Sequence, residues 1–182
     1  MLELKQMMEE MLANLPADPK TPSERFMVSS AHVSIAHSHT NAGRLESAVQ
    51  EHTVAANLGN AEGMHNLGIC LLEGQGTTKN IEIGKYWILK ASDQPIDDSK
   101  DLFQGANPIM AFKGQAAAWN AIGNFHVSGL YGFRKDETAA KEDEEFFLLN
   151  TLRAPRQDRM QGGHEGWRRG HRHRLPMRTR KT

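Results

Sequence analysis

The stretch HVSIAHSH contains three histidines, the first residues in the chain whose chemistry suggests a site. Imidazole nitrogens bind zinc, and ligands on one helix share a face when they are three or four residues apart. His32, His37 and His39 are instead separated by five and two residues. Cys70 is the only cysteine, so it offers neither a second thiolate ligand nor an intrachain disulfide. We therefore expect no metal site here.

The segment GQGTTK, residues 74–79, combines glycine amides with Thr77, Thr78 and Lys79, groups that can hold a phosphate. A P-loop requires the pattern G-x-x-x-x-G-K-[ST] between a strand and a helix. Here the lysine is displaced, and no strand pattern precedes it. The acidic run 142–145 is typical of a solvated helix face, and no nucleophile can be paired with a base. We expect a non-enzymatic protein that needs no cofactor.

Apolar spacing predicts that helices position these side chains. In residues 1–15 the apolar residues recur at steps of three and four, which predicts an amphipathic helix that ends at Pro16. The proline-rich segment that follows predicts a linker, so that residues 1–28 form an N-terminal region. Residues 29–57 predict an αα-hairpin, and residues 60–92 predict a second one.

Glycines mark the second hairpin. A glycine inside a helix costs about 1 kcal/mol relative to alanine, so three of them within residues 67–78 require compensation. We expect Gly68 to remove a side chain where a partner helix presses against the backbone. Gly74 and Gly76 are expected to adopt positive φ, ending one helix and turning the chain.

The same six-residue glycine spacing recurs after residue 120, with one extra residue in the following turn, at Gly123, Gly129 and Gly132. Internal repetition on this scale predicts an all-α solenoid over residues 29–150, in which αα-hairpins stack on their neighbours. Residues 93–114 separate the two copies as an insert. This insert is either a loop on the binding face or an ordinary surface loop.

These motifs resemble the Sel1-like repeats, a subclass of the tetratricopeptide-like αα-solenoids. In the first copy the resemblance is carried by Leu67-Gly68, Gly74-Gln75-Gly76, Tyr86-Trp87 and Lys90-Ala91. The second copy matches through Ile122-Gly123, Gly129 and Ala140, but its aromatic pair Phe146-Phe147 comes about three residues late. Residues 29–58 are more similar to a plain tetratricopeptide hairpin.

The resemblance implies a scaffold that holds a peptide or a helix of a partner protein on its concave face. Carried over to this chain, the family pattern places on that face the residues His37, Glu62, His65, Ile69, Glu73, Asn120, Asn124 and Val127. It also places Val33 there. Repeats of this family are generally not enzymes, which agrees with the lack of a catalytic motif.

Charge divides the chain into an acidic body and a basic tail. Residues 1–150 hold 12 Lys+Arg against 20 Asp+Glu, whereas residues 151–182 hold 10 against 2. The tail is predicted to be disordered, because it has too few apolar residues to offset its ordering entropy. Three roles remain open for it. The tail could bind a polyanion, either nucleic acid or an anionic membrane. It could instead fold back on the acidic body, or have no specific role. The polyanion-binding residues would be Arg168, Arg169, Arg172 and Arg174.

Two further expectations concern location and assembly. No apolar run approaches the roughly 18 residues of a membrane-spanning helix, and the first residues do not form a secretory signal. A lone cysteine suits a reducing compartment, so we expect a cytoplasmic protein. The apolar residues 146–149 have no following helix to cover them, so two copies could form a homodimer through this C-terminal repeat.

Overall fold

The structure, a computed structural model of the chain, describes residue 10, residues 13–94 and residues 108–142, with side chains in the last range described from Gly114 onward. Every regular element in these ranges is helical, which confirms the predicted all-α class. In chain order the elements are α2 (Pro22–Asn41), α3 (Leu45–Asn57), α4 (Ala61–Glu73), α5 (Ile81–Ser92), α6 (Pro108–Ser128) and the short 3-10 helix η1 (Leu130–Gly132). A further helix begins at residue 137.

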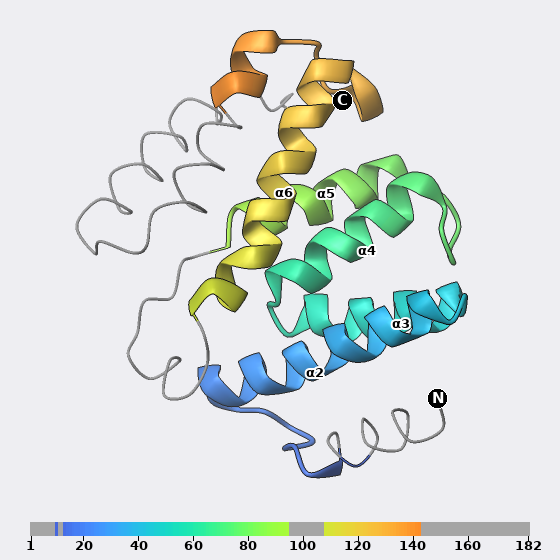
Figure 1. Cartoon of the computed structure of the whole chain (residues 1–182), viewed down its shortest axis with the longest axis vertical. Helices are drawn as coiled ribbons and strands as arrows, with labels where there is room; N and C mark the ends of the chain where they lie inside the picture. Colours follow the sequence, from blue (N-terminus) through green and yellow to red (C-terminus); the bar gives the residue numbers. More distant parts are fainter. Residues whose placement is uncertain (1–9, 11–12, 95–107, 143–182) are drawn as a thin grey trace, which may run out of the picture.

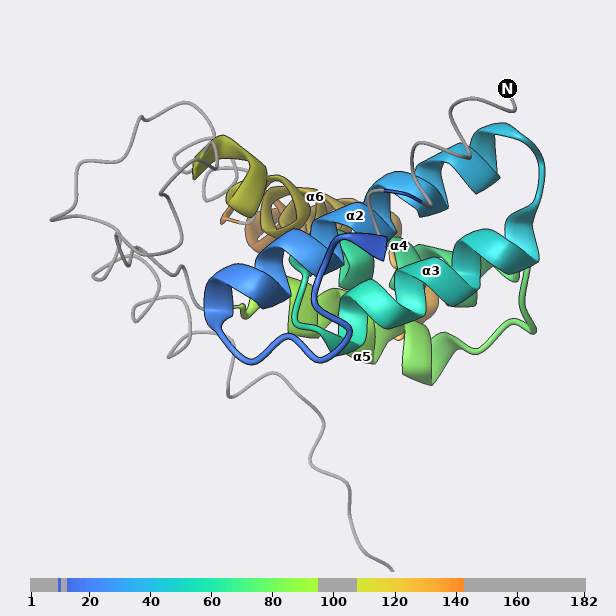
Figure 2. The same cartoon turned by 90° about the horizontal axis from the view of Figure 1, so that it is seen from below.

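Each helix packs mainly against its neighbours in the chain. Figure 1 shows the pair α2 and α3 below the pair α4 and α5, with α6 rising beside them. Figure 2 looks at the first pair with the other helices behind it. Helix α4 lies at the centre, because it packs against α3, α5 and α6, whereas α2 packs mainly against α3. None of the described helices is long and apolar enough to cross a membrane.

Helix α2 begins at Pro22, earlier than the hairpin start predicted at Ser29. The Thr21 hydroxyl accepts the Glu24 N–H at 3.1 Å, and the Glu24 carboxylate accepts the Thr21 N–H at 3.0 Å. This reciprocal capping box satisfies two backbone donors at the start of the helix. Pro22 suits the next position, because the first helical residue has no intrahelical partner for an N–H. The predicted linker therefore ends at the N-cap Thr21, and the helix begins at Pro22.

Two glycines let α4 and α5 cross at close range. A Cβ added at Gly68 would lie 2.7 Å from the Ile88 side chain and 3.0 Å from the Gly84 carbonyl oxygen. A Cβ added at Gly84 would lie 2.7 Å from Leu72. Both distances are shorter than real Cβ contacts, so each helix needs a glycine where the other approaches. The role predicted for Gly68 is confirmed, and its cost within the helix is offset by the packing of Leu72 and Ile88.

The turns that follow α4 and α6 have the same construction. Gly74 and Gly129 both have positive φ, at 77° and 66°. After the first turn, the Asn80 N–H donates to the Leu71 carbonyl, and the Asn80 side chain caps α5. After the second turn, Asp136 donates to His126 and caps the helix that begins at residue 137. The predicted correspondence between the two glycine turns is thus present in their hydrogen bonds.

Helix α6 begins at Pro108, inside the segment 93–114 that we predicted as an insert. Helix α6 touches the first turn of α4, because a Cβ at Gly114 would clash with the backbone of Ala61 and Glu62. The Gln115 side chain also donates to the carbonyl of Ser92 at 3.1 Å. The last part of the predicted insert is therefore helical, and residues 95–107 lie outside the described residues.

The core lies where α4, α5 and α6 meet. Trp119 and Ile122 of α6 are fully buried, as are Met64 and Leu72 of α4 and Ile88 of α5. Helix α6 thus completes the core of the α4–α5 hairpin. A hairpin of α4 and α5 alone would leave these side chains in water.

Replacing Gly68 by alanine should destabilise the protein by about 1 to 3 kcal/mol, because the new methyl group overlaps Ile88 and the Gly84 backbone. Urea unfolding of the full chain measures the difference. Gly43→Asn is the control, since Gly43 lies in the turn between α2 and α3 where no atom lies within 4 Å of an added Cβ, and Asn tolerates its positive φ. A Gly68→Ala variant as stable as the wild type would mean that the helices do not cross there.

Candidate partner-binding site

The predicted site residues come from the first helix of each hairpin. His37 lies on α2, Glu62 and Glu73 lie on α4, and Asn120 and Asn124 lie on α6. Helices α4 and α6 are packed side by side, whereas α2 makes few contacts with α4. The structure therefore brings the residues of α4 and α6 onto adjoining helices and joins α2 to them at particular contacts.

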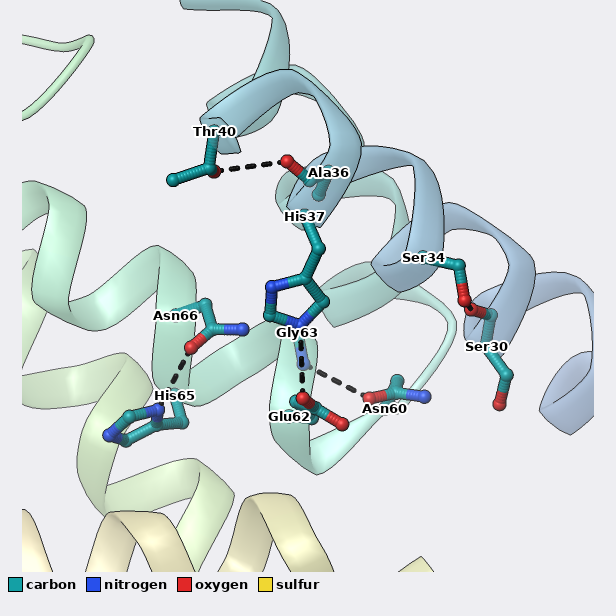
Figure 3. A network of polar contacts seen from close by, with 10 residues as sticks. All are labelled: Ser30, Ser34, Ala36, His37, Thr40, Asn60, Glu62, Gly63, His65 and Asn66. Atoms are coloured by element: carbon teal, nitrogen blue, oxygen red, sulfur yellow. Dashed lines mark hydrogen bonds and ion pairs between the residues drawn. The ribbon is translucent and has the colours of Figure 1, made fainter. Parts of the chain in front are cut away.

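His37 and Glu62 form one of those contacts. The His37 Nε2 lies 3.1 Å from the Glu62 Oε1, and the two side chains are 48% and 19% exposed. Figure 3 shows His37 reaching from α2 toward Glu62 in the first turn of α4. Asn60, the N-cap of α4, accepts the Gly63 N–H at 3.0 Å and so fixes this turn. Two residues predicted separately for the face therefore form one bridge between helices.

His52 of α3 lies next to this bridge, and it was not predicted from the sequence as part of the site. It is only 3% exposed, and its ring meets the His37 ring edge to face at 5.9 Å between centroids. Its Nδ1 has no hydrogen-bond partner among the described residues. Burial is the main reason that the pKa of His52 falls to about 4; His37 and His65 lower it further, and Glu62 opposes them. The sequence could have indicated its burial, because His52 is four residues after Ala48 and three before Ala55, so the three residues share the buried side of α3.

His65 is a partly buried residue that contacts its neighbour. Its Nδ1 lies 3.1 Å from the Asn66 Oδ1, and burial lowers the pKa of the His65 imidazole (Figure 3). The Asn66 Nδ2 is buried and has no partner among the described groups. His65 therefore presents less polar surface to a partner than we predicted.

Two apolar positions predicted for the face are buried to different degrees. Val33 is only 5% exposed and belongs to the buried side of α2, so its predicted place on the exposed face is wrong. Ile69 is half-buried and packs against the core. The family pattern misplaced Val33, which lies on the same side of α2 as the buried Ser29 and Ala36, whereas His37 one turn later is exposed.

Helix α6 presents the most accessible part of the face. Asn120 and Asn124 are exposed, and the Asn124 Nδ2 donates to the Asn120 Oδ1 at 2.7 Å. Val127 is 50% exposed, and Leu130 in η1 is 49% exposed. The end of α6 therefore combines two carboxamides with apolar surface, a combination that can bind both main-chain groups and side chains of a peptide.

The described part of the predicted face contains carboxylates but no Lys or Arg. Helix α4 contains Glu62 and Glu73 but no Lys or Arg, and α6 contains neither from Gly114 onward. Glu73 is exposed and accepts a hydrogen bond from Gln75. Among the described residues, no group of three or more His, Cys, Asp or Glu side chains is placed to hold a metal ion. A partner with basic or neutral polar groups matches this surface better than an acidic one.

The other predicted residues lie outside the described part of the chain. These are the polyanion-binding arginines Arg168, Arg169, Arg172 and Arg174, the aromatic pair Phe146-Phe147, and most of the helix predicted over residues 1–15. Comparison of the chain with protein-family models, curated proteins and solved structures gave no match.

The buried His52 should make the protein less stable in acid. Its pKa is lower in the folded state, so the unfolded state binds more protons between about pH 4 and pH 6.5, and stability falls as the pH decreases through that window. Between pH 6.5 and 5 the loss should be about 2 kcal/mol. Urea unfolding at several pH values measures it.

His52→Phe keeps a ring at this position and removes the titration. The variant should therefore lose about 2 kcal/mol less than the wild type over the same pH range. His39→Gln, a change in the last turn of α2, is the control and should behave like the wild type. Equal acid sensitivity in the wild type and His52→Phe would show that His52 is not the titrating group.

Proposed function

We propose that this chain is a Sel1-like solenoid of αα-hairpins that acts as a non-enzymatic adaptor in the cytoplasm. Its partner would be a peptide or helical segment of another protein, held across the first helices α4 and α6. The bridge from His37 to Glu62 would set the edge of this face at α2. Asn120, Asn124 and Val127 would provide the main contacts, because all three are exposed on one helix.

The observation that carries this proposal is the shared construction of the turns after α4 and α6. Each turn has a glycine with positive φ, a backbone bond back to the preceding helix and an Asn or Asp that caps the next helix. Stacked units of this kind place their first helices side by side and so build one continuous face. The packing of α6 on α4 agrees with that arrangement.

The chemistry of the face favours an extended segment with basic or polar side chains. The bond between Asn124 and Asn120 uses one amide N–H of Asn124 and leaves the amide N–H groups of Asn120 and the Asn124 oxygen available to a peptide bond. Glu73 is exposed near the C-terminal end of α4 and could pair with a Lys or Arg of the partner. Val127 and Leu130 would cover an apolar side chain.

The second candidate is a polyanion-binding protein that acts through its tail. The opposite charges of residues 1–150 and 151–182 favour it, and the residues would be Arg168, Arg169, Arg172 and Arg174. Binding of this kind releases counterions and weakens steeply as salt rises. Contacts that depend on burial and carboxamide hydrogen bonds persist in salt, so the two functions can be separated.

A displayed library of random peptides, selected against the full-length chain in high salt, tests the adaptor function. We expect enriched peptides whose affinity falls by about tenfold or more in Asn120→Ala/Asn124→Ala, because each lost hydrogen bond at a desolvated contact costs about 1 kcal/mol. Asn57→Ala, an exposed asparagine of the second helix α3, is the matched control and should bind normally.

A variant with the four tail arginines replaced by glutamine completes the test. The adaptor function predicts that this variant keeps the selected peptides. Peptides that bind Asn120→Ala/Asn124→Ala normally but are lost with the arginines would contradict it. A single-stranded oligonucleotide, tested in low and high salt, serves as the probe for polyanion binding.

A further inference from the structure

The α2–α3 hairpin is joined to α4 by small and polar groups. A Cβ at Gly63 would lie 2.6 Å from the Ala55 Cβ, and α3 adds only Ala56 to the buried core cluster, with the partly buried Val49 packed against it. The Asn60 Nδ2 donates to the Ser29 Oγ at 3.2 Å, which joins α2 to the N-cap of α4. The other polar contact is the bridge from His37 to Glu62.

A junction with few apolar side chains separates at a smaller free energy than a large apolar core does. The large buried residues of this protein lie elsewhere, between α4, α5 and α6. The first turn of α4 is therefore the place where the α2–α3 hairpin can come away while the rest of the fold stays together.

Ionisable groups gather at this junction. His52 faces His37 from α2, and Glu62 and His65 from α4. Glu62 is the only carboxylate in the set, so a second or third protonated imidazole has no further negative charge to offset it. His32 and Glu51 form a separate contact between α2 and α3, with 2.6 Å between nitrogen and oxygen.

Protonation would affect the exposed and buried rings differently. A charge on the half-exposed His37 strengthens its contact with Glu62, since the hydrogen bond becomes an ion pair. A charge on His52 is instead buried, and its Nδ1 has no acceptor among the described residues. The low-cost way to accommodate that charge is to expose the ring to water, which requires separating α3 from α4.

We propose that protonation releases the α2–α3 hairpin from the rest of the fold. A positive charge on His52, which the neighbouring His37 and His65 disfavour, separates the hairpin from the first turn of α4. This separation removes one side of the candidate face. The effect on partner binding rests on the proposed function. The release itself does not, because it involves only groups within this chain.

Hydrogen exchange of the full chain at about pH 7 and about pH 5, corrected for the intrinsic rates, tests the release. We expect the protection of amides in α2 and α3 to fall by about tenfold or more at the lower pH, and to be lower than that of the core amides in α4 and α5, which exchange only when the whole fold opens. Equal protection of all helices at the lower pH would overturn the proposal, because all amides would then exchange through global unfolding.

Two variants identify the group responsible. His52→Phe should remove the pH response, whereas His32→Gln should retain it, since His32 belongs to the separate contact with Glu51. Glu62→Gln should move the release to higher pH, because the carboxylate that offsets the charge is gone. A response that persists in His52→Phe would overturn the proposal.

The wild-type protein provides a measurement that needs no variant. The imidazole signal of His52, followed by NMR, should keep the neutral position until the α2 and α3 amides lose protection. A signal that moves to its protonated position while those amides stay protected would also overturn the proposal. If the release occurs but no peptide binds the face, the hairpin inference stands and the adaptor function fails.

Discussion

The fold depends on close approach of helix backbones to α4. Gly68 and Gly84 allow α5 to cross α4, Gly63 allows α3 to lie against its first turn, and Gly114 allows α6 to touch that same turn. Each contact excludes even a methyl group, so the separation and crossing of the helices are set by backbone atoms. Glycine weakens the isolated helix, but packing on three sides offsets that cost.

Helix α4 also carries more of the predicted site residues than any other helix. Its first turn supplies Glu62 and the cap residue Asn60, and the same turn receives α3 and α6. Its second half packs against α5 through Leu72. The exposed side chains of α6 are held in place because Trp119 and Ile122 on the same helix are buried in the core. A face built on packed helices keeps its shape without a ligand, which lowers the ordering cost of binding.

The parts of the fold that were predictable from sequence depend on local patterns. Gly74 and Gly129 mark turns because positive φ favours glycine, and the spacing to Gly68 and Gly123 identified the two copies. The start of α2 had a local signal in Thr21 and Glu24, which the neighbouring prolines obscured. The contact of Gly114 with α4 had no local signal, because it joins distant segments. His52 could be placed on a buried side, but its neighbours could not be predicted, since they come from α2 and α4.

NMR mapping of a selected peptide on the labelled full-length chain tests the central claim, that a partner binds the face of α4 and α6. The account predicts that the largest shift changes fall on Asn120, Asn124, Val127 and the exposed end of α4 at Glu73, and that they persist in high salt. Changes confined to residues 151–182, and lost in high salt, would contradict it and assign binding to the basic tail.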